Sequence, residues 1–317
     1  MENNNTLSAY GGEGWSPRHK SLRDEIGQIW RVCGVDSEWA LLRAVLLHRP
    51  GREMDDLQSP DEAHMLESVD ATSVRNQHDN IAQTLRKYGV AIHYVNPIDT
   101  PPPNQIFVAD LLFMTPEGAI LGRPASTVRA GEERSVARRL ADLGIPILRN
   151  IRGTGTFEGA DAAWLDERTV LLATGLRTNQ EGANQVTKVL SEMGVDVIQV
   201  GLPFGSMHLM GELRFTDRDL AIARRGRTPF AAVQALRAHG CTVVFTPDED
   251  EVIGGMALNF VTLGPRQILM SAGNPITQDF FEAAGITCVT VETDEIGKAA
   301  GGIGCLTGVL ERELVGK

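Results

Sequence analysis

One pattern of apolar and polar positions occurs five times along this chain of 317 residues. Each copy begins with an amphipathic stretch of helical spacing and ends with an apolar, β-branched run that is typical of a buried strand. Between the two parts stands a glycine, which can take the left-handed conformation that ends a helix; the five are Gly89, Gly144, Gly194, Gly240 and Gly285. The pattern therefore predicts five helix–strand units of one kind.

Four of the units continue into two apolar stretches separated by turn residues, which is the pattern of a β-hairpin. These hairpins are expected at 107–123, 160–174, 212–224 and 257–271. The fifth unit has only half a hairpin, and an apolar run without a partner lies at 39–47. Pairing these two chain ends would leave no open sheet edge. We therefore predict an α/β fold, a five-bladed pseudo-fivefold propeller of ββαβ repeats, closed by pairing of the N- and C-terminal strands.

Two other architectures are less consistent with the pattern. A doubly wound parallel sheet also alternates helices and strands, but the segments between these helices read as hairpins, and no GxGxxG opens a helix after a first strand. An open solenoid would not need matching half-blades at its two ends. We expect residues 1–36 to be a polar extension with one short helix near 21–30, and residues 37–317 to form a single propeller domain.

Composition narrows the function classes. The chain has 41 acidic and 30 basic residues, and a net charge of −11 disfavours nucleic-acid binding. No apolar run is long enough to span a membrane, and the four cysteines lack metal-ligand spacing. We expect a cytoplasmic protein that acts on a small molecule without a metal or cofactor. The extension is expected to pack over the ring or over a neighbouring subunit of a homo-oligomer.

Aligning the hairpins brings polar residues from separate blades to one mouth of the ring. The first residue of each inner strand falls at Asp110, Asp161, a position near Glu212 or Leu213, Asn259 and Cys305. His208 and Glu158 lie a few residues before the equivalent positions of their own blades. Convergence of carboxylates, a carboxamide, a thiol and an imidazole from distant segments predicts a site at this mouth.

Each candidate residue of this site also has a purely structural interpretation. Buried cysteines are usually inert, and Cys33, Cys241 and Cys288 lie in apolar contexts, whereas Cys305 follows a glycine-rich segment that leaves a thiol accessible. His208 is the histidine that the alignment sends to the mouth. Asp110 and Asp161 interrupt apolar runs, and buried carboxylates need hydrogen-bonding or cationic partners.

The motifs FVAD, RP-x4-R, TFEGAD, RTN-x2-G, HL and a C-terminal glycine-rich cysteine, in this order, resemble those of the guanidino-group-modifying superfamily. Its members include dimethylarginine dimethylaminohydrolase, arginine deiminase and glycine amidinotransferase. The resemblance covers roughly residues 39–310 and implies the same five-bladed propeller. It also implies site roles: Cys305 as nucleophile, His208 as general acid and base, Glu158 as the carboxylate that orients His208, Asp110 as a carboxylate of the guanidinium site, and Arg129 and Arg177 as the pair that holds the amino-acid end of the substrate.

Three positions depart from this resemblance. Asn104 and Ala109 stand where the dimethylaminohydrolases have acidic residues, and Met210 stands where arginine deiminase has an aspartate. Each charged hydrogen bond removed from a desolvated site weakens cation binding by about 1–3 kcal/mol. We therefore expect a substrate that is less cationic than arginine.

The chemistry expected from a thiol and a histidine is covalent hydrolysis at a carbon bonded to nitrogens. Cys305 attacks this carbon, His208 protonates the leaving group, and water then releases the product. The leaving group stays open: ammonia, an alkylamine, or nitrite from a neutral ring. Our specific expectation is 2-nitroimidazole hydrolysis with nitrite release. The alternatives are a dimethylargininase, an arginine deiminase-type hydrolase, an amidinotransferase, and a non-catalytic propeller that binds partners as a ribosome anti-association factor does.

Overall fold

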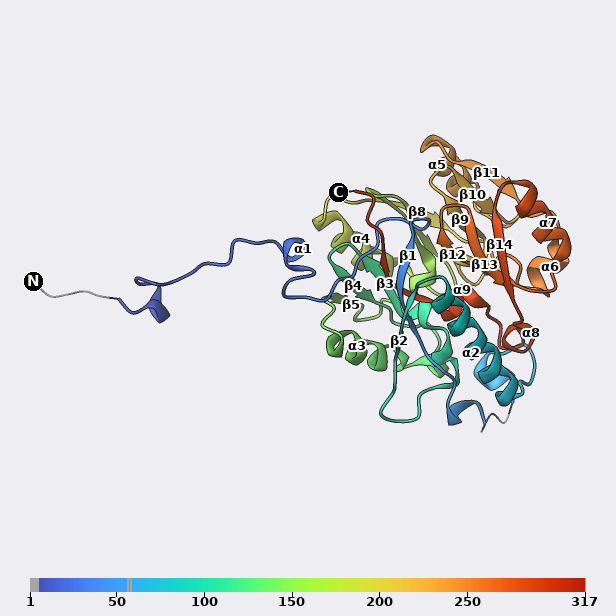
Figure 1. Cartoon of the computed structure of the whole chain (residues 1–317), viewed down its shortest axis with the longest axis horizontal. Helices are drawn as coiled ribbons and strands as arrows, with labels where there is room; N and C mark the ends of the chain where they lie inside the picture. The colour runs from blue at the N-terminus through green and yellow to red at the C-terminus, as the bar shows by residue number, and fades with distance from the viewer. Residues whose placement is uncertain (1–5, 56, 58, 317) are drawn as a thin grey trace, which may run out of the picture.

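Five small mixed sheets form the body of the computed structural model, which describes residues 6–55, 57 and 59–316 (Figure 1). In four sheets an antiparallel hairpin is followed by a third strand that pairs in parallel, and in the fifth the antiparallel pair is formed by the strands of the two chain ends. The predicted five-bladed α/β propeller of ββαβ repeats is thus confirmed. The sheets are β3 (Leu112–Thr115), β4 (Gly118–Leu121) and β5 (Ile147–Asn150); β6 (Ala162–Asp166), β7 (Thr169–Thr174) and β8 (Asp196–Gly201); β9 (Leu213–Asp217), β10 (Leu220–Ala223) and β11 (Thr242–Phe245); β12 (Val261–Gly264), β13 (Gln267–Ser271) and β14 (Thr287–Val291); and β15 (Gly308–Arg312), β1 (Leu42–Leu47) and β2 (Ala91–Tyr94).

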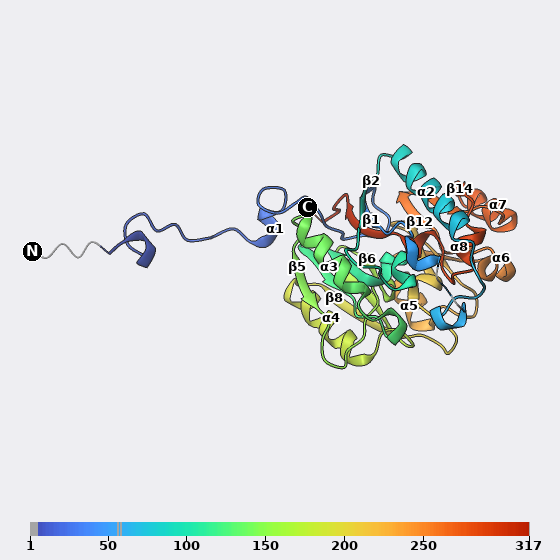
Figure 2. The ribbon, with the colours of Figure 1, turned by 90° about the horizontal axis from the view of Figure 1, so that it is seen from below.

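One helix in each sheet's segment connects the second strand to the third and lies on the outside of the body (Figures 1 and 2). The glycine after each of these helices has a positive φ between 72° and 82°, which confirms the predicted helix ends. The connecting helices are α2 (Ala71–Lys87), α3 (Glu132–Asp142), α4 (Gln180–Glu192), α5 (Phe230–Ala238) and α7 (Pro275–Ala283), and the shorter ones are α1 (Leu22–Glu25), α6 (Glu249–Ile253), α8 (Asp294–Gly297) and α9 (Ile303–Leu306).

The apolar core lies between these helices and the sheets. The sheet that contains β6 illustrates it: the Trp164 ring is fully buried, stacks on Phe113 of the neighbouring sheet at 5.8 Å, and donates its indole N–H to Met114 O. Burial of such rings is the main stabilising contribution to a fold of this size. Because the apolar residues lie between helix and sheet, polar side chains remain at the inner ends of the blades.

The two chain ends share one sheet. Strand β1 pairs antiparallel with β15, with Val45 opposite Val309 and Leu46 opposite Gly308. A side chain at Gly308 would lie 2.7 Å from Val108 Cγ1, so only glycine fits at this crossing. The predicted pairing of the N- and C-terminal strands is confirmed.

The N-terminal extension leaves the body near α1. Figures 1 and 2 show that the segment before α1 projects away from the sheets. The segment after α1 contacts the body at several points: Ile26 packs on the core, Arg31 N donates to Gly144 O, and Gly34 forms a bridge with Glu311. In this chain residues 6–20 do not lie over the ring. Of the helices described, none combines the length and apolar character that crossing a membrane requires.

Candidate active site

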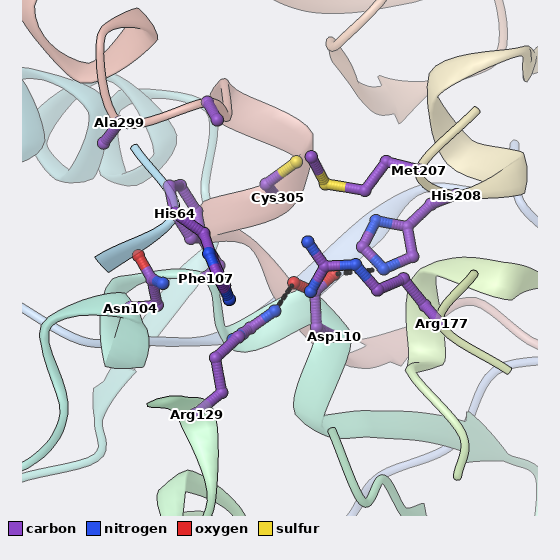
Figure 3. Close-up of a pocket in the computed structure, with 11 residues that line it drawn as sticks. His64, Asn104, Phe107, Asp110, Arg129, Arg177, Met207, His208, Ala299 and Cys305 are labelled. Carbon is purple, nitrogen blue, oxygen red and sulfur yellow. Dashed lines mark hydrogen bonds and ion pairs between the residues drawn. The ribbon is translucent and has the colours of Figure 1, made fainter. Parts of the chain in front are cut away.

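A pocket lies where the predicted mouth was expected, between the turns that precede the inner strands (Figure 3). Asp110 belongs to a 3₁₀ turn, Val108–Leu111, directly before β3, and Cys305 belongs to α9 before β15. These residues therefore precede their strands rather than starting them, which corrects the register we expected. The lining residues are His64, Asn104, Phe107, Asp110, Arg129, Arg177, Met207, His208, Ala299, Ala300 and Cys305.

The glycines of the turn that carries Cys305 pack closely against neighbouring side chains, which holds this turn in place. A Cβ on Gly301 would lie 2.3 Å from the Phe107 ring, and one on Gly304 would lie 2.7 Å from Asn259 Oδ1. Asn259 in turn accepts from Cys305 N at 3.1 Å and donates from Nδ2 to Cys305 Sγ at 3.0 Å. Asn259, predicted at the mouth, therefore holds the thiol and its backbone together.

The thiol of Cys305 is not ionised by its surroundings alone. Burial raises its pKa above the ordinary value, and the nearby charge of Asp110 raises it further. The Asn259 amide, the Gly302 N–H and the positive charge of Arg214 act in the opposite direction but do not outweigh burial. A thiolate at neutral pH therefore needs an additional positive charge, which a cationic substrate or a protonated His208 can supply.

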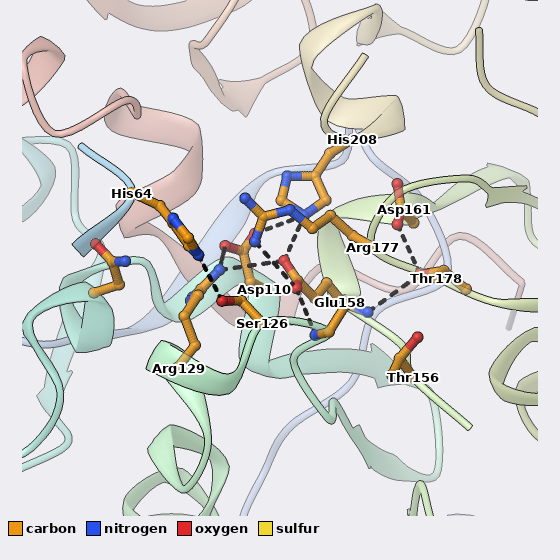
Figure 4. Close-up of polar contacts among 12 residues, drawn as sticks. His64, Asp110, Ser126, Arg129, Thr156, Glu158, Asp161, Arg177, Thr178 and His208 are labelled. Carbon is orange, nitrogen blue, oxygen red and sulfur yellow. Dashed lines mark hydrogen bonds and ion pairs between the residues drawn. The ribbon is translucent and has the colours of Figure 1, made fainter. Parts of the chain in front are cut away.

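His208 and Glu158 form a buried pair (Figure 4). His208 Nε2 lies 2.6 Å from Glu158 Oε2. Burial by itself lowers the pKa of His208, but the charge of Asp110 and the hydrogen bond with Glu158 outweigh it and raise the pKa to about 9. The same pairing, together with Arg129 and Arg177, lowers the pKa of Glu158 to about 2 against the effect of burial. His208 is therefore a proton donor at neutral pH, as a general acid must be.

Asp110 presents one free oxygen to the pocket. Its Oδ2 accepts from Arg129 Nη1 at 2.7 Å, while the buried Oδ1 has no partner among the described residues and lies 3.8 Å from His208 Nε2. A buried acceptor of this kind calls for an N–H or O–H donor from a ligand. Asp110 can thus bind a substrate nitrogen.

The two arginines differ in what they can offer. Arg129 is buried, and its guanidinium is hydrogen-bonded by Glu132, Asp110 and Glu158. These hydrogen bonds use N–H groups of the Arg129 guanidinium, which the resemblance assigned to a substrate carboxylate. Arg177 is held by one longer contact, 3.5 Å from its Nη1 to Glu158 Oε1, and lines the pocket. The geometry leaves Arg177 as the better placed of the two for an acidic group.

Four predicted residues do not line this pocket: Glu158 and Asn259, which contact His208 and Cys305, and Asp161 and Met210. Asp161 accepts from Thr178 Oγ1 at 2.7 Å and from Leu209 N at 3.0 Å, so both its oxygens are bound inside the protein. Burial raises its pKa to about 6. Asp161 positions the residue after His208 instead of contacting a ligand. Met210 lines a different cavity, together with Ala109, so neither stands beside the free oxygen of Asp110.

Asn104 does line the pocket, with its Nδ2 donating to Ala63 O at 2.6 Å. Sequence reasoning missed His64, which also lines the pocket. His64 has a φ of 56° and its Nε2 lies 2.8 Å from Ser126 Oγ. It belongs to a loop before α2 with no repeat equivalent, so blade alignment gave no signal for it. Phe107 and Met207 were missed because apolar residues next to site motifs are indistinguishable from core residues.

A metal ion is one possible occupant of the acidic group. The ligand atoms of Asp110, Glu158 and His208 lie within 4.8 Å of one another. However, Arg129 Nη1 donates to both carboxylates, at 2.7 Å and 3.2 Å. A guanidinium in this position already supplies the positive charge that a metal would bring, so the arrangement is better suited to proton transfer.

Family models match two successive parts of the chain. The model of N,N dimethylarginine dimethylhydrolase, eukaryotic, matches residues 53–202, and that of arginine deiminase matches residues 217–312. The chain is 24% identical over 273 residues to a dimethylarginine dimethylaminohydrolase of Pseudomonas aeruginosa, covering 84% of this chain and 99% of that protein. It is 27% identical over 248 residues to the protein of the same name from Streptomyces coelicolor, covering 78% and 90%.

Solved structures agree on the fold. The Pseudomonas aeruginosa dimethylarginine dimethylaminohydrolase, complexed with citrulline, superposes with a TM-score of 0.72 at 23% identity, covering 84% of this chain and 98% of that one. An amidinotransferase of saxitoxin biosynthesis from Microseira wollei gives 0.72 at 13% identity, covering 90% and 98%. With models of two such enzymes matched in order along the chain and the same fold, the comparisons support the guanidino-group-modifying superfamily for this chain.

Proposed function

We propose that this protein is a cysteine-dependent hydrolase that cleaves a C–N bond at a guanidine- or amidine-type carbon. One observation carries the proposal: Cys305, the His208–Glu158 pair and the free oxygen of Asp110 surround the same pocket (Figures 3 and 4). The curated relatives named as dimethylarginine dimethylaminohydrolase and arginine deiminase are hydrolases of such bonds. A binding module without chemistry would have no need of this combination.

The reaction follows from the protonation states. Cys305 Sγ, as thiolate, attacks the carbon, and His208 donates its proton to the departing group, so that a thiouronium-type adduct and a neutral imidazole remain. His208 then takes a proton from water while the water oxygen attacks the same carbon. Collapse of this intermediate breaks the C–S bond and returns the thiolate. Asp110 Oδ1 accepts from a substrate N–H and stabilises the positive charge that develops on it.

The substrate best supported by the comparisons is a methylated arginine. Two bacterial relatives that match most of this chain are named for dimethylarginine, and Arg177 lies where it can bind a carboxylate. A cationic substrate would also lower the pKa of the Cys305 thiol, which burial has raised. Nothing in these comparisons supports nitroimidazole, so the dimethylargininase alternative takes precedence over our first expectation.

A less cationic substrate stays a second candidate because of one observation. The carboxylate that faces the pocket, Asp110, is already paired with Arg129, and Asn104, which also lines the pocket, is neutral. The local charge is thus weaker than a guanidinium prefers. 2-Nitroimidazole, with nitrite as its leaving group, is the neutral candidate.

A substrate panel separates the two candidates. Wild-type protein is assayed with dimethylarginine, arginine and 2-nitroimidazole while methylamines, ammonia and nitrite are measured. We expect kcat/KM on the order of 10⁴ M⁻¹s⁻¹ or higher for the true substrate. Turnover of the ring alone would replace the first candidate by the second. Absence of any turnover in a protein whose Cys305 reacts with iodoacetamide would contradict both.

Arg177 provides a second discriminator. Arg177→Gln is expected to raise KM for dimethylarginine about tenfold or more, because a charged hydrogen bond is worth about 1.5–3 kcal/mol. Turnover of 2-nitroimidazole, which has no carboxylate, should change little. Arg152→Gln, at an exposed position outside the pocket, is the matched control.

A further inference from the structure

A second polar cavity lies next to the turn of Cys305 but shares no lining residue with the pocket. It consists of two adjoining hollows of about 20 and 60 Å³, both lined by Glu38, Ala162 and Met210. Arg214 lines the smaller hollow and Arg312 the larger one. The proposed reaction uses neither arginine, so their position calls for a separate explanation.

Both guanidinium groups are only partly satisfied by the protein. Arg312 is 4% exposed, donates from Nη1 to Ala40 O at 2.6 Å, and has no partner for its buried Nε within the described residues. Arg214 donates to the carbonyl of Phe260 and lies over its ring, 5.4 Å from the centroid. Carbonyls and an aromatic face do not neutralise a cation as a carboxylate does.

Neither arginine has an acidic partner at contact distance. Across residues 6–55, 57 and 59–316, no carboxylate oxygen lies within 4.0 Å of the nitrogens of Arg214 or Arg312. Glu38 is the one acidic residue among those that line the hollows, and its Oε1 accepts from Trp164 N at 3.0 Å. Two guanidinium groups thus share one carboxylate that is itself hydrogen-bonded to the backbone.

A buried excess of positive charge is costly unless an anion balances it. This cost is reflected in the pKa of Arg312, which burial lowers to about 10. The charge of Glu38 acts to raise this pKa, whereas the charge of Arg214 acts to lower it. A water-sized occupant needs about 10–15 Å³ of such space. The two hollows therefore admit an ion or a few waters but not a phosphate ester or an amino acid.

We propose that this cavity binds one small monovalent anion of chloride size between Arg214 and Arg312. Ala162 and Met210 in the remaining lining are apolar. The hydroxyl groups of Thr262 and Thr307 already donate to backbone carbonyls, so the two guanidinium groups are the donors for the anion. The site is distinct from the substrate pocket, so its occupancy does not depend on which substrate the pocket accepts.

An anion in this cavity also acts on the nucleophile. Met210 Sδ lies 3.3 Å from where a Cβ of Gly304 would stand, which places the cavity directly beside the Cys305 turn. The positive charge of Arg214 favours the thiolate of Cys305. A bound anion offsets this charge, so chloride should slow the alkylation of Cys305 at a fixed pH.

Anomalous diffraction from bromide-soaked crystals of the full chain tests the site. The expected result is one bromide peak between Arg214 and Arg312 that is absent in Arg214→Met and present in Arg266→Met, an arginine that already pairs with Asp217 and Asp219. Ordered water without a bromide peak would overturn the proposal, as would a peak that survives Arg214→Met.

A solution measurement covers the case in which Arg214→Met does not fold. Iodoacetamide alkylation of wild-type Cys305 is followed at pH 8 in sodium chloride and in sodium gluconate of equal ionic strength. We expect alkylation to be severalfold slower in chloride and the thermal midpoint to be higher, because ligand binding to the native state stabilises it. Equal rates and equal midpoints in the two salts would overturn the proposal.

Discussion

Asp110 and Asp161 occupy equivalent places in neighbouring blades, yet they have opposite roles. Each lies in a 3₁₀ turn directly before an inner strand. Both oxygens of Asp161 are bound, by Thr178 Oγ1 and Leu209 N, whereas Asp110 keeps one unpartnered oxygen in the pocket. The repeat thus determines where a carboxylate stands, and the residues from other segments around it determine whether a ligand can reach it.

The largest expected effect concerns the fifth equivalent position, Cys305. If this position supplies the nucleophile, Cys305→Ser should lower kcat by about 10³-fold or more, because a serine hydroxyl is a far weaker nucleophile at this pH. The thermal midpoint should change little. Cys241→Ser, at a buried position in the core, is the control and should keep its activity. Substantial turnover by Cys305→Ser would remove the nucleophile from this position.

The same substitution at both aspartates tests the comparison directly. Asp110→Asn should lower kcat/KM about 10- to 100-fold, since a charged hydrogen bond worth about 1.5–3 kcal/mol is lost in the reaction. Asp161→Asn should instead lower the free energy of unfolding by about 1 kcal/mol and affect turnover less. Kinetics and thermal unfolding of the two variants give the answer. Equal losses of activity, with unchanged stability, would mean that both carboxylates contact the substrate.

Protonation of His208 gives a prediction for the pH profile. Its pKa of about 9 means that the acid form is complete at neutral pH, so kcat/KM should fall as pH rises through about 9. Glu158→Gln removes the charge bound to His208 and should move this alkaline limb to lower pH. Because the pKa of His208 is higher in the folded than in the unfolded chain, its protonation stabilises the folded state below about pH 6.5. This contribution is lost as the pH rises through about 9. An alkaline limb unmoved by Glu158→Gln would assign it to another group.

The smallest expected effect concerns Asn104, a neutral residue of the pocket lining. Asn104→Asp adds a negative charge there and should lower KM for dimethylarginine by roughly fivefold, about 1 kcal/mol, while raising KM for a neutral ring. Loss of the hydrogen bond to Ala63 limits the gain. Ala109→Glu is the matched control, because Ala109 lines the other cavity and should not improve binding of the cation. Steady-state kinetics with both substrates measures the difference.

The sequence carried most of the fold because local signals repeat. A glycine after each helix and a turn inside each hairpin are backbone requirements, so they appear as residue types at fixed spacing. The pairing of β1 with β15 followed from two apolar runs that lacked partners. The length of the extension that packs on the body could not be predicted, since it depends on single contacts such as Gly34 with Glu311.

The site was predictable only as far as the repeat extends. Alignment of blades brought Asp110, Asn259 and Cys305 together and placed His208 and Glu158 near them, and the resemblance added the roles of these residues. The prediction of the site failed where the direction of a side chain decides which cavity it lines. Ala109 and Met210 were expected near a bound guanidinium and instead face the second cavity. Nor could sequence show that Arg129 is occupied by carboxylates, because its partners come from three segments.

The sheet shared by β1 and β15 sets an order for biosynthesis. The final strand pairs with the first one across almost the entire chain, and contacts so distant in sequence form slowly. Cys305 lies directly before that final strand, so a ribosome-bound chain displays the partly built pocket before its thiol emerges. We infer that a chain synthesised only as far as its fourth blade lacks the proposed nucleophile, and that reactivity begins only when β15 pairs with β1.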